Sequence, residues 1–278
     1  MGRDLNPRQL LARAGIRPKK RFGQTFLQNA PAARTIARLS VAGSQGARIL
    51  EIGAGTGALT LALLEEGADL TAIEIDTDLV ALLRSRAPLA GLEIVQADAM
   101  EFDYLAWSSG RRWHVAGNLP YNIATALMLR LIEMEHGPDS LTVMVQKDVA
   151  ERFIAGPATP AYGSLSVAVQ YAMHAQPLLT LPPESFYPPP KVHSSVVRLV
   201  RRAEPAVSPR DSATFWKVVR GAFAYRRKTL ANSLSLALDL DRAKIARALK
   251  LSNLSPELRG ERLDLGDFAR LADALAEG

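Results

Sequence analysis

One short segment of the chain carries groups that can bind and activate an amine. It consists of Asn118, Leu119, Pro120 and Tyr121. The Oδ1 atom of Asn118 and the carbonyl of Leu119 are hydrogen-bond acceptors, and the Tyr121 ring is a flat apolar surface. The segment follows an apolar run at residues 113–117, which is expected to be a buried strand. These groups suit an exocyclic amine on a planar base, which needs acceptors and a stacking partner. A proline turn with a packed tyrosine is the simpler alternative.

For an adenine base, the same segment predicts a mechanism. The N6 lone pair is delocalised into the ring, so the amine is a weak nucleophile, and no ordinary side-chain base can deprotonate it first. Acceptors at Asn118 Oδ1 and the Leu119 carbonyl can hold both N–H groups, so that the nitrogen becomes pyramidal toward a methyl donor. Tyr121 would fix the plane of the base. Catalysis is then mainly positioning and stabilisation of the charge that develops on N6.

A glycine-rich segment at residues 53–57 follows an apolar run at residues 48–52 and precedes a helical pattern. Its glycines permit a tight turn and let backbone N–H groups approach a ligand closely. Glu74 ends the next apolar run, where a carboxylate can bind both hydroxyls of a ribose. A strand, glycine loop, helix and acid in this order predict a nucleotide-like cofactor.

Two further acids favour S-adenosylmethionine over NAD as that cofactor. Glu51 lies two residues before the first glycine, where an acid suits an ammonium group rather than a pyrophosphate. Asp98 follows the third strand pattern and can accept a hydrogen bond from an adenine amino group, although a helix N-cap is its simpler role. No positioned His or Arg for a hydride acceptor follows, and His114 is expected in the core.

Strand and helix patterns alternate through the first half of the chain, which predicts a parallel sheet covered by helices. The expected strands are residues 48–52, 70–75, 92–96, 113–117 and 141–145. Residues 178–181 and 192–200 also resemble strands, but only a proline-rich loop joins them, so an antiparallel edge is expected. Helical patterns fill the chain after a linker near residue 205. The predicted domains are residues 1–203 and 204–278.

Composition and charge limit the class of protein. The 278 residues are 48% hydrophobic and contain no cysteine, which excludes disulfides and cysteine-bound metals. We find no apolar run near the ~20 residues of a membrane span and no secretory signal pattern in residues 1–20. A cytoplasmic protein without a membrane anchor or a metal is therefore expected.

The basic residues are concentrated at the two ends of the chain. Residues 1–28 hold seven Lys/Arg and one acid, residues 29–200 hold twelve and seventeen, and residues 201–278 hold fifteen and ten. Scattered charges usually form solvated helix faces, whereas clustered cations favour a polyanion such as RNA. The cations expected to contact RNA are Lys19, Lys20, Arg21, Arg226, Arg227 and Lys228.

With these residues in view, the sequence closely resembles the bacterial small-subunit (16S) ribosomal RNA adenine N6,N6-dimethyltransferase family. The matching segments are residues 20–27, 50–57, 73–76, 98–100, 118–122, 162–166, 186–192 and 226–229. They extend over nearly the whole chain. The asparagine tetrapeptide alone occurs in other N6-adenine methyltransferases, whereas the complete set is specific.

The resemblance implies a Rossmann-like class I methyltransferase sheet with an antiparallel last strand, followed by a small all-α domain that binds rRNA. It implies Phe186 as a second aromatic residue facing the base. Thr25 departs from the family, which usually has asparagine at that position. The expected S-adenosylmethionine-binding residues are Thr25, Leu27, Glu51, Gly53, Gly55, Gly57, Glu74, Asp98, Ala99 and Asn118.

The implied substrate is a pair of adjacent adenosines in the 3′-terminal hairpin of 16S rRNA, each dimethylated by a monomeric enzyme within a partly assembled 30S subunit. Three alternatives remain. One is a related enzyme that methylates large-subunit rRNA and confers macrolide resistance. The second is a nucleic-acid-binding factor with this fold but without catalysis, and the third is an NAD oxidoreductase.

Overall fold

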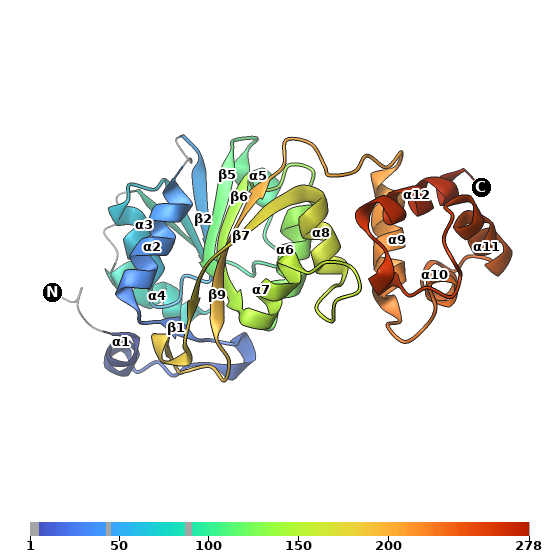
Figure 1. The fold of residues 1–278 in the computed structure, drawn as a ribbon. Helices are drawn as coiled ribbons and strands as arrows, with labels where there is room; N and C mark the ends of the chain where they lie inside the picture. Colours follow the sequence, from blue (N-terminus) through green and yellow to red (C-terminus); the bar gives the residue numbers. More distant parts are fainter. Residues whose placement is uncertain (1–5, 43–45, 87–90, 278) are drawn as a thin grey trace. The chain divides into compact units, whose positions relative to one another are not determined.

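The computed structural model describes residues 6–42, 46–86 and 91–277 (Figure 1). The chain divides into two compact units, Met1–Ala150 with Ala175–Arg201, and Glu151–His174 with Arg202–Gly278. The predicted domains, residues 1–203 and 204–278, differ from these units in the placement of residues 151–174 and of residues 202 and 203. Of those two domains, residues 1–5, 43–45, 87–90 and 278 lie outside the described part of the chain.

The first unit is built on a seven-stranded sheet with the strand order β4-β3-β2-β5-β6-β9-β7. The strands from β2 to β6 pair in parallel, and β9 pairs antiparallel with β6. This confirms the predicted Rossmann-like α/β fold with an antiparallel strand. The strands are β2 (Arg48–Ile52), β3 (Leu70–Glu74), β4 (Leu92–Gln96), β5 (Trp113–Asn118), β6 (Ser140–Gln146), β7 (Met173–Leu181) and β9 (Ser194–Arg201).

Helices cover both faces of this sheet (Figure 1). The helices before residue 155 are α1 (Pro7–Ala14), which packs on Phe26 and Leu79, α2 (Ala30–Val41), α3 (Ala58–Glu65), α4 (Thr77–Arg86), α5 (Tyr104–Ser108), α6 (Ala124–Glu133) and α7 (Lys147–Ile154). Helices α2 and α3 pack on one face, in a cluster with the sheet residues Leu70 and Ala116. On the other face, the indole N–H of Trp107 in α5 donates to the hydroxyl of Thr71, 3.1 Å away. The short helix α5 is not apparent from the sequence pattern.

Gly117 allows the two strands that carry the predicted site to approach each other closely. A Cβ atom at this position would lie 2.6 Å from the carbonyl oxygen of Ile52 on β2. Since real Cβ atoms essentially never come so near, only glycine fits here without a backbone shift. The close approach places the end of β5, at Asn118, beside the start of the glycine-rich loop after β2.

A second, two-stranded sheet joins the N-terminal arm to the proline-rich segment. Strands β1 (Phe26–Leu27) and β8 (Phe186–Tyr187) pair antiparallel, with Leu27 opposite Phe186. The sequence predicts neither strand, because two residues are too few to show a period. Two 3₁₀ turns, η1 (Lys20–Phe22) and η2 (Pro183–Ser185), lie next to them in the chain.

The second unit is helical, as expected for the C-terminal part of the chain. Its helices are α8 (Ser164–Ala172), α9 (Ser212–Ala224), α10 (Leu230–Leu238), α11 (Arg242–Leu251) and α12 (Leu265–Ala276), with the short turn η3 (Gly260–Arg262). Phe215, Leu234 and Phe268 form its core together with Tyr162 from the segment before α8. This packing explains why residues 151–174 belong to the helical unit. Thr229 caps α10, which begins at Leu230.

Candidate active site

A cavity of about 290 Å³ lies in the first unit where β2, β3 and β5 end. The carboxyl ends of parallel strands are the usual ligand sites of open α/β sheets. Nine of the residues predicted for the site line it. They are Thr25, Gly53, Gly55, Glu74, Asp98, Ala99, Asn118, Leu119 and Pro120.

Asn118 is fixed by one end of its amide and left unpartnered at the other. Its Nδ2 donates to the carbonyl oxygen of Thr25 at 2.7 Å. Its Oδ1 is buried and has no hydrogen-bond partner among the described residues. A buried acceptor without a partner costs free energy, so this oxygen is suited to receive a donor from a ligand.

The neighbouring Leu119 is held by its amide rather than by its carbonyl. Its side chain is buried, and its N–H donates to the carbonyl of Met144 on β6 at 3.0 Å. Within the described part of the chain, no hydrogen bond to its own carbonyl oxygen occurs, whereas the Pro120 carbonyl accepts from Ile123 and Ala124. Two consecutive residues at the cavity thus each offer a free acceptor.

Thr25 acts through its backbone in this arrangement. Its carbonyl accepts the Asn118 amide, a bond that any residue type at position 25 can make. This explains why threonine can replace the asparagine that is usual in the family without loss of that contact.

Glu74 closes the floor of the cavity at the end of β3 and is only 6% exposed. Its Oε2 accepts from the Gly55 N–H at 2.9 Å, and its Oε1 accepts from the Asp76 N–H at 3.0 Å. Burial raises the pKa of Glu74, and these backbone hydrogen bonds oppose that shift. Each oxygen retains a lone pair, so the carboxylate can bind two further donors such as ribose hydroxyls.

Asp98 caps a turn rather than the helix suggested as its simpler role. Its Oδ1 accepts from the Met100 N–H at 2.8 Å and so stabilises the turn after β4, while the residue also lines the cavity. The carbonyl of Ala99 accepts from the Tyr104 hydroxyl at 2.6 Å. Burial raises the pKa of Tyr104 to about 12, so the phenol stays a donor at neutral pH.

The glycines of the loop have different functions. Gly55 has φ +57°, and a Cβ there would lie 3.0 Å from the Phe26 ring of the arm. Gly57 does not line the cavity; it has φ +84°, and a Cβ would lie 2.7 Å from Leu83 of α4. The positive φ favours glycine at position 57, outside the cavity, and Gly53 and Gly55 form the cavity wall.

Glu51 lies behind that wall rather than in it. The residue is 1% exposed and does not line the cavity, whereas the following Ile52 and Gly53 do. Its Oε2 has no hydrogen-bond partner in the described part of the protein. Burial raises the pKa of Glu51 to about 7, against a smaller opposing effect of Thr60. From this buried position, Glu51 does not face the cavity in which the expected ammonium group would lie.

The predicted base-facing aromatic residues lie outside the cavity. The Tyr121 hydroxyl is hydrogen-bonded to the Ser194 hydroxyl at 2.7 Å, which fixes its half-buried ring next to the asparagine. Phe186 is only 1% exposed and packs in the core with Leu27 of β1. The expectation that Phe186 faces a base needs this correction, because the β1–β8 pairing turns its ring inward. Leu27 is likewise a core residue.

The arm contributes more of the cavity than its sequence suggests. Among the lining residues not predicted for the donor site are Arg21, Phe22, Gly23, Gln24 and Phe26. The interleaved basic and aromatic residues in this stretch were the available signal, since the stretch has no regular period. Arg21 is exposed and lies 4.6 Å from the Phe22 ring centre.

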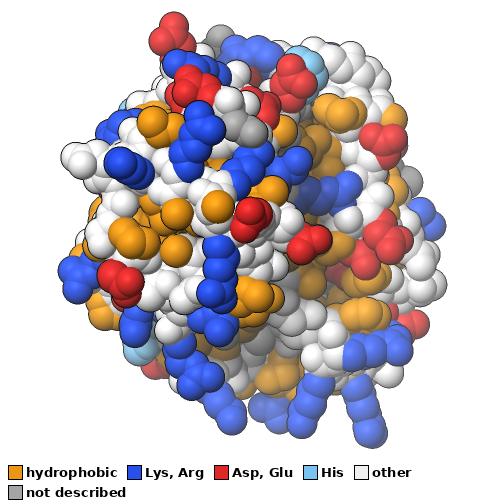
Figure 2. Space-filling view, turned by 90° about the vertical axis from the view of Figure 1, so that its right-hand side faces the viewer, with side chains coloured by type: hydrophobic (Ala, Val, Ile, Leu, Met, Phe, Trp, Pro, Cys, Tyr) orange, Lys and Arg blue, Asp and Glu red, His pale blue; other side chains and the backbone are white. Residues whose placement is uncertain are grey.

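The predicted RNA-contacting cations differ in their exposure. Lys20, Arg226, Arg227 and Lys228 are exposed, and the last three form a turn between α9 and α10. Lys19 instead pairs with the carboxylates of two aspartates and does not present a free charge. Figure 2 shows lysine and arginine side chains spread over the face in view, with fewer acidic ones between them.

No helix among residues 6–42, 46–86 and 91–277 is long and apolar enough to cross a membrane. In the same ranges, no three His, Asp or Glu side chains are grouped as a metal site requires.

Comparison with known proteins agrees with this geometry. The model of the family "Ribosomal RNA adenine dimethylase" matches residues 15–274. The chain belongs to this family. Members are methyltransferases, and the protein is accordingly an rRNA adenine N6-dimethyltransferase that uses S-adenosylmethionine.

Relatives of the family agree along almost their full length. The chain is 43% identical to "Ribosomal RNA small subunit methyltransferase A" of Pseudomonas aeruginosa over 94% of this chain and 96% of that protein. It is 38% identical to the protein of the same name from Lactococcus lactis, over 98% and 94%.

Solved structures share the fold of this family. A dimethyladenosine transferase from Plasmodium falciparum has a TM-score of 0.70 at 24% identity, covering 88% of this chain and 95% of that one. The 23S rRNA methyltransferase ErmE has a TM-score of 0.61 at 23% identity, covering 90% and 99%.

Proposed function

We propose that this protein dimethylates N6 of two adjacent adenosines in the 3′-terminal hairpin of 16S rRNA, within a partly assembled small subunit. The observation that carries the proposal is the buried, unpartnered Oδ1 of Asn118 at a nucleotide-sized cavity. The names of the relatives support the small subunit as the source of the RNA. The enzyme acts in the cytoplasm as a monomer.

The cavity residues fit S-adenosylmethionine. Glu74 has lone pairs left for the ribose hydroxyls, and Asp98 has a second carboxylate oxygen for the adenine amino group. Gly53 and Gly55, both at positive φ, allow the loop backbone to approach the donor. When bound, this cofactor supplies a methyl group already activated by its sulfonium sulfur.

The chain's own residues act on the target amine. Asn118 Oδ1 and the Leu119 carbonyl accept its two N–H groups, which withdraws the lone pair from the ring and directs it toward the methyl group. The same acceptors stabilise positive charge developing on N6. Because the Asn118 amide is already held by Thr25, little reorganisation accompanies the reaction. The alkylated amine is acidic and then loses its proton to water.

The second methyl transfer uses the same acceptors differently. After the first transfer the amine retains one N–H group, so one of the two acceptors has no partner in the second round. The site must also admit the first methyl group. The second transfer is therefore expected to be the slower one.

The direct test is methyl transfer from labelled S-adenosylmethionine to three substrates: unmodified small subunits, naked 16S rRNA and large-subunit rRNA. Incorporation is expected in small subunits. Incorporation confined to large-subunit rRNA would overturn the proposed substrate, and the absence of transfer to any RNA would favour a binding factor without catalysis.

Glu74→Gln is expected to weaken binding of S-adenosylhomocysteine about 30-fold, since the glutamine amide has a single acceptor oxygen and no negative charge. Isothermal titration calorimetry measures this directly. Glu101→Gln, an exposed position in the same unit, is the control for loss of one negative charge. An affinity for Glu74→Gln within threefold of wild type would remove the ribose role from this residue.

Replacing Arg226, Arg227 and Lys228 by glutamine is expected to lower affinity for small subunits at least about tenfold. The slope of log affinity against log salt concentration should fall by the equivalent of two to three phosphate contacts. Binding is measured by filter retention over a series of salt concentrations. A triple glutamine variant at Arg242, Arg247 and Lys250, which are exposed on α11, is the control. Equal losses in both variants would show a general charge effect and no specific RNA contact at the turn.

A further inference from the structure

One wall of the donor cavity is formed by the arm that precedes β1. Residues 21–26 line the cavity together with the loop after β2 and the end of β3. The Thr25 carbonyl ties one end of this wall to Asn118. The contacts at the other end of this wall, before residue 21, therefore determine whether it remains in place over a bound donor.

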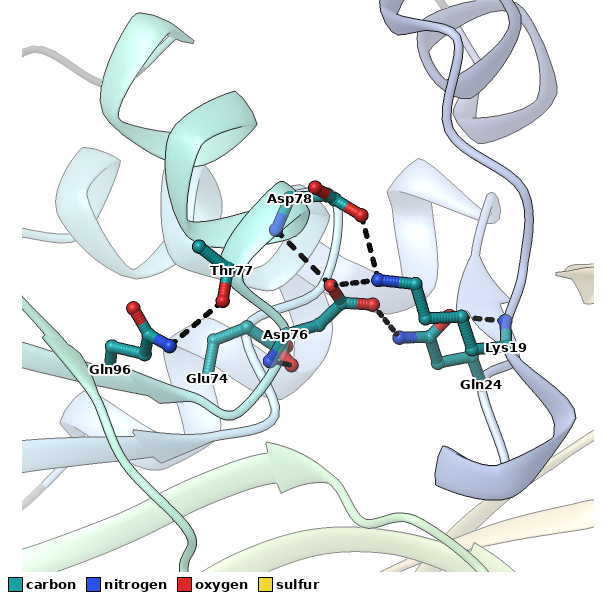
Figure 3. A network of polar contacts seen from close by, with 7 residues as sticks. All are labelled: Lys19, Gln24, Glu74, Asp76, Thr77, Asp78 and Gln96. Carbon is teal, nitrogen blue, oxygen red and sulfur yellow. Dashed lines mark hydrogen bonds and ion pairs between the residues drawn. The ribbon is translucent and has the colours of Figure 1, made fainter.

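Lys19 holds that other end through an ionic clasp (Figure 3). Its Nζ lies 2.6 Å from Asp76 Oδ1 and 2.7 Å from Asp78 Oδ2. Gln24 Nε2 donates to the second oxygen of Asp76 at 2.7 Å, and Gln24 Oε1 accepts from the Lys19 N–H at the same distance. The clasp therefore fixes both ends of the segment that contains Arg21, Phe22 and Gly23.

The clasp is also hydrogen-bonded to Glu74, whose carboxylate is proposed to bind the donor. The backbone N–H of Asp76 donates to Glu74 Oε1, and Glu74 Oε2 accepts from Gly55. A single residue, Asp76, thus joins the arm through its side chain and Glu74 through its backbone (Figure 3). Because Asp76 contacts both, a movement of the arm would shift Asp76 and, through it, Glu74.

The charge of Lys19 is needed for this arrangement. The Asp76 side chain is only 1% exposed, whereas that of Asp78 is 57% exposed. Burial works to raise the pKa of Asp76, but the hydrogen bonds from Lys19 and Gln24 outweigh it, and the net pKa is lowered. Without Lys19, a buried carboxylate would lose its cation, which is far more costly than loss of an exposed ion pair.

We propose that Lys19 is a positioning residue for the methyl-transfer reaction: it holds the arm over the S-adenosylmethionine site and, through Asp76, keeps Glu74 in place. The inference rests on the proposed function for the identity of the donor. It gives Lys19 a role other than the RNA contact predicted from its neighbours. Lys20 and Arg21 follow it in the chain and remain exposed for RNA.

The test compares Lys19→Met with Lys20→Met, which removes the same charge from the adjacent exposed position. Lys19→Met is expected to weaken S-adenosylhomocysteine binding about tenfold and to raise the KM for the donor similarly, with kcat at saturating donor within about twofold. Lys20→Met is expected to keep wild-type donor affinity. Lys19→Arg retains the cation and should recover most of the loss.

Three outcomes would overturn the proposal: wild-type donor affinity in Lys19→Met, equal losses in both methionine variants, or a lower kcat at unchanged KM. If wild type itself fails to bind S-adenosylhomocysteine, the donor assignment fails instead of the clasp. A thermal melt shows whether Lys19→Met is folded. If it is not, Asp78→Asn keeps the Asp76 pair and is expected to weaken donor binding about two- to threefold, and an unchanged affinity there would contradict the clasp.

Discussion

Asn118→Ala is expected to lower kcat for methyl transfer about a thousandfold, because the substitution removes a preorganised acceptor from the amine in the transition state. In the wild type, Asn118 Oδ1 is buried without a partner, so no protein group competes for it. Donor affinity should change by less than about fivefold, since Glu74 and Asp98 are unaltered. Single-turnover kinetics on small subunits and calorimetry with S-adenosylhomocysteine measure the two quantities separately.

Two variants control this experiment. Asn122→Ala removes another amide that lines the cavity and is expected to lower kcat less than about tenfold. Asn118→Asp keeps an acceptor oxygen but loses the donor to the Thr25 carbonyl, so it tests the role of that tether. Equal losses of donor affinity and kcat in Asn118→Ala would disprove the assignment of Asn118 to the amine.

The difference in the free energy of unfolding between Glu51→Gln and wild type is expected to change by about 3 kcal/mol across the full titration of Glu51. The buried carboxyl has its pKa raised from 4.5 to about 7. A raised pKa means that the folded state binds the proton more tightly. The resulting stabilisation is complete below the unfolded-state value of 4.5 and is lost as pH rises through about 7.

Glutamine is neutral at every pH, so the variant lacks this loss. Relative to wild type, Glu51→Gln should therefore become progressively more stable between about pH 4.5 and pH 7.5. Urea unfolding without donor at several pH values measures the difference. Glu65→Gln, at an exposed position, controls for removal of one negative charge. A constant difference between Glu51→Gln and wild type over this range would show that Glu51 does not titrate there.

The sequence was sufficient for the parts of the fold that have a clear period. The parallel strands and most helices follow from apolar runs and from caps such as Gly15, which ends α1 at φ +68°. The antiparallel strand β9 follows from the missing crossover helix. Segments with two or three residues per element, such as β1, β8 and η1, have no period, and tertiary packing alone determines them.

The same limit applies to the site. Residues at the ends of strands, such as Glu74, Asp98 and Asn118, were predicted because parallel strands bring their carboxyl ends together. For Glu51, Phe186 and Lys19 the sequence does not indicate whether the side chain points into the cavity, into the core or toward solvent. For Phe186 the choice is made by the pairing of β1 with β8, and for Lys19 by the Asp76 clasp, which both connect segments far apart in the chain. Glu51 is buried on β2, behind the loop that forms the cavity wall.

The account places two successive methyl transfers on one adenine nitrogen at Asn118 and Leu119. Nucleoside analysis by mass spectrometry of small-subunit RNA after exhaustive reaction tests this most directly. The predicted product is N6,N6-dimethyladenosine at two adjacent positions near the 3′ end of 16S rRNA, with N6-monomethyladenosine as a transient species. Methyl groups on another atom of the base or on the ribose, or a reaction that stops at one methyl group per adenosine, would contradict it.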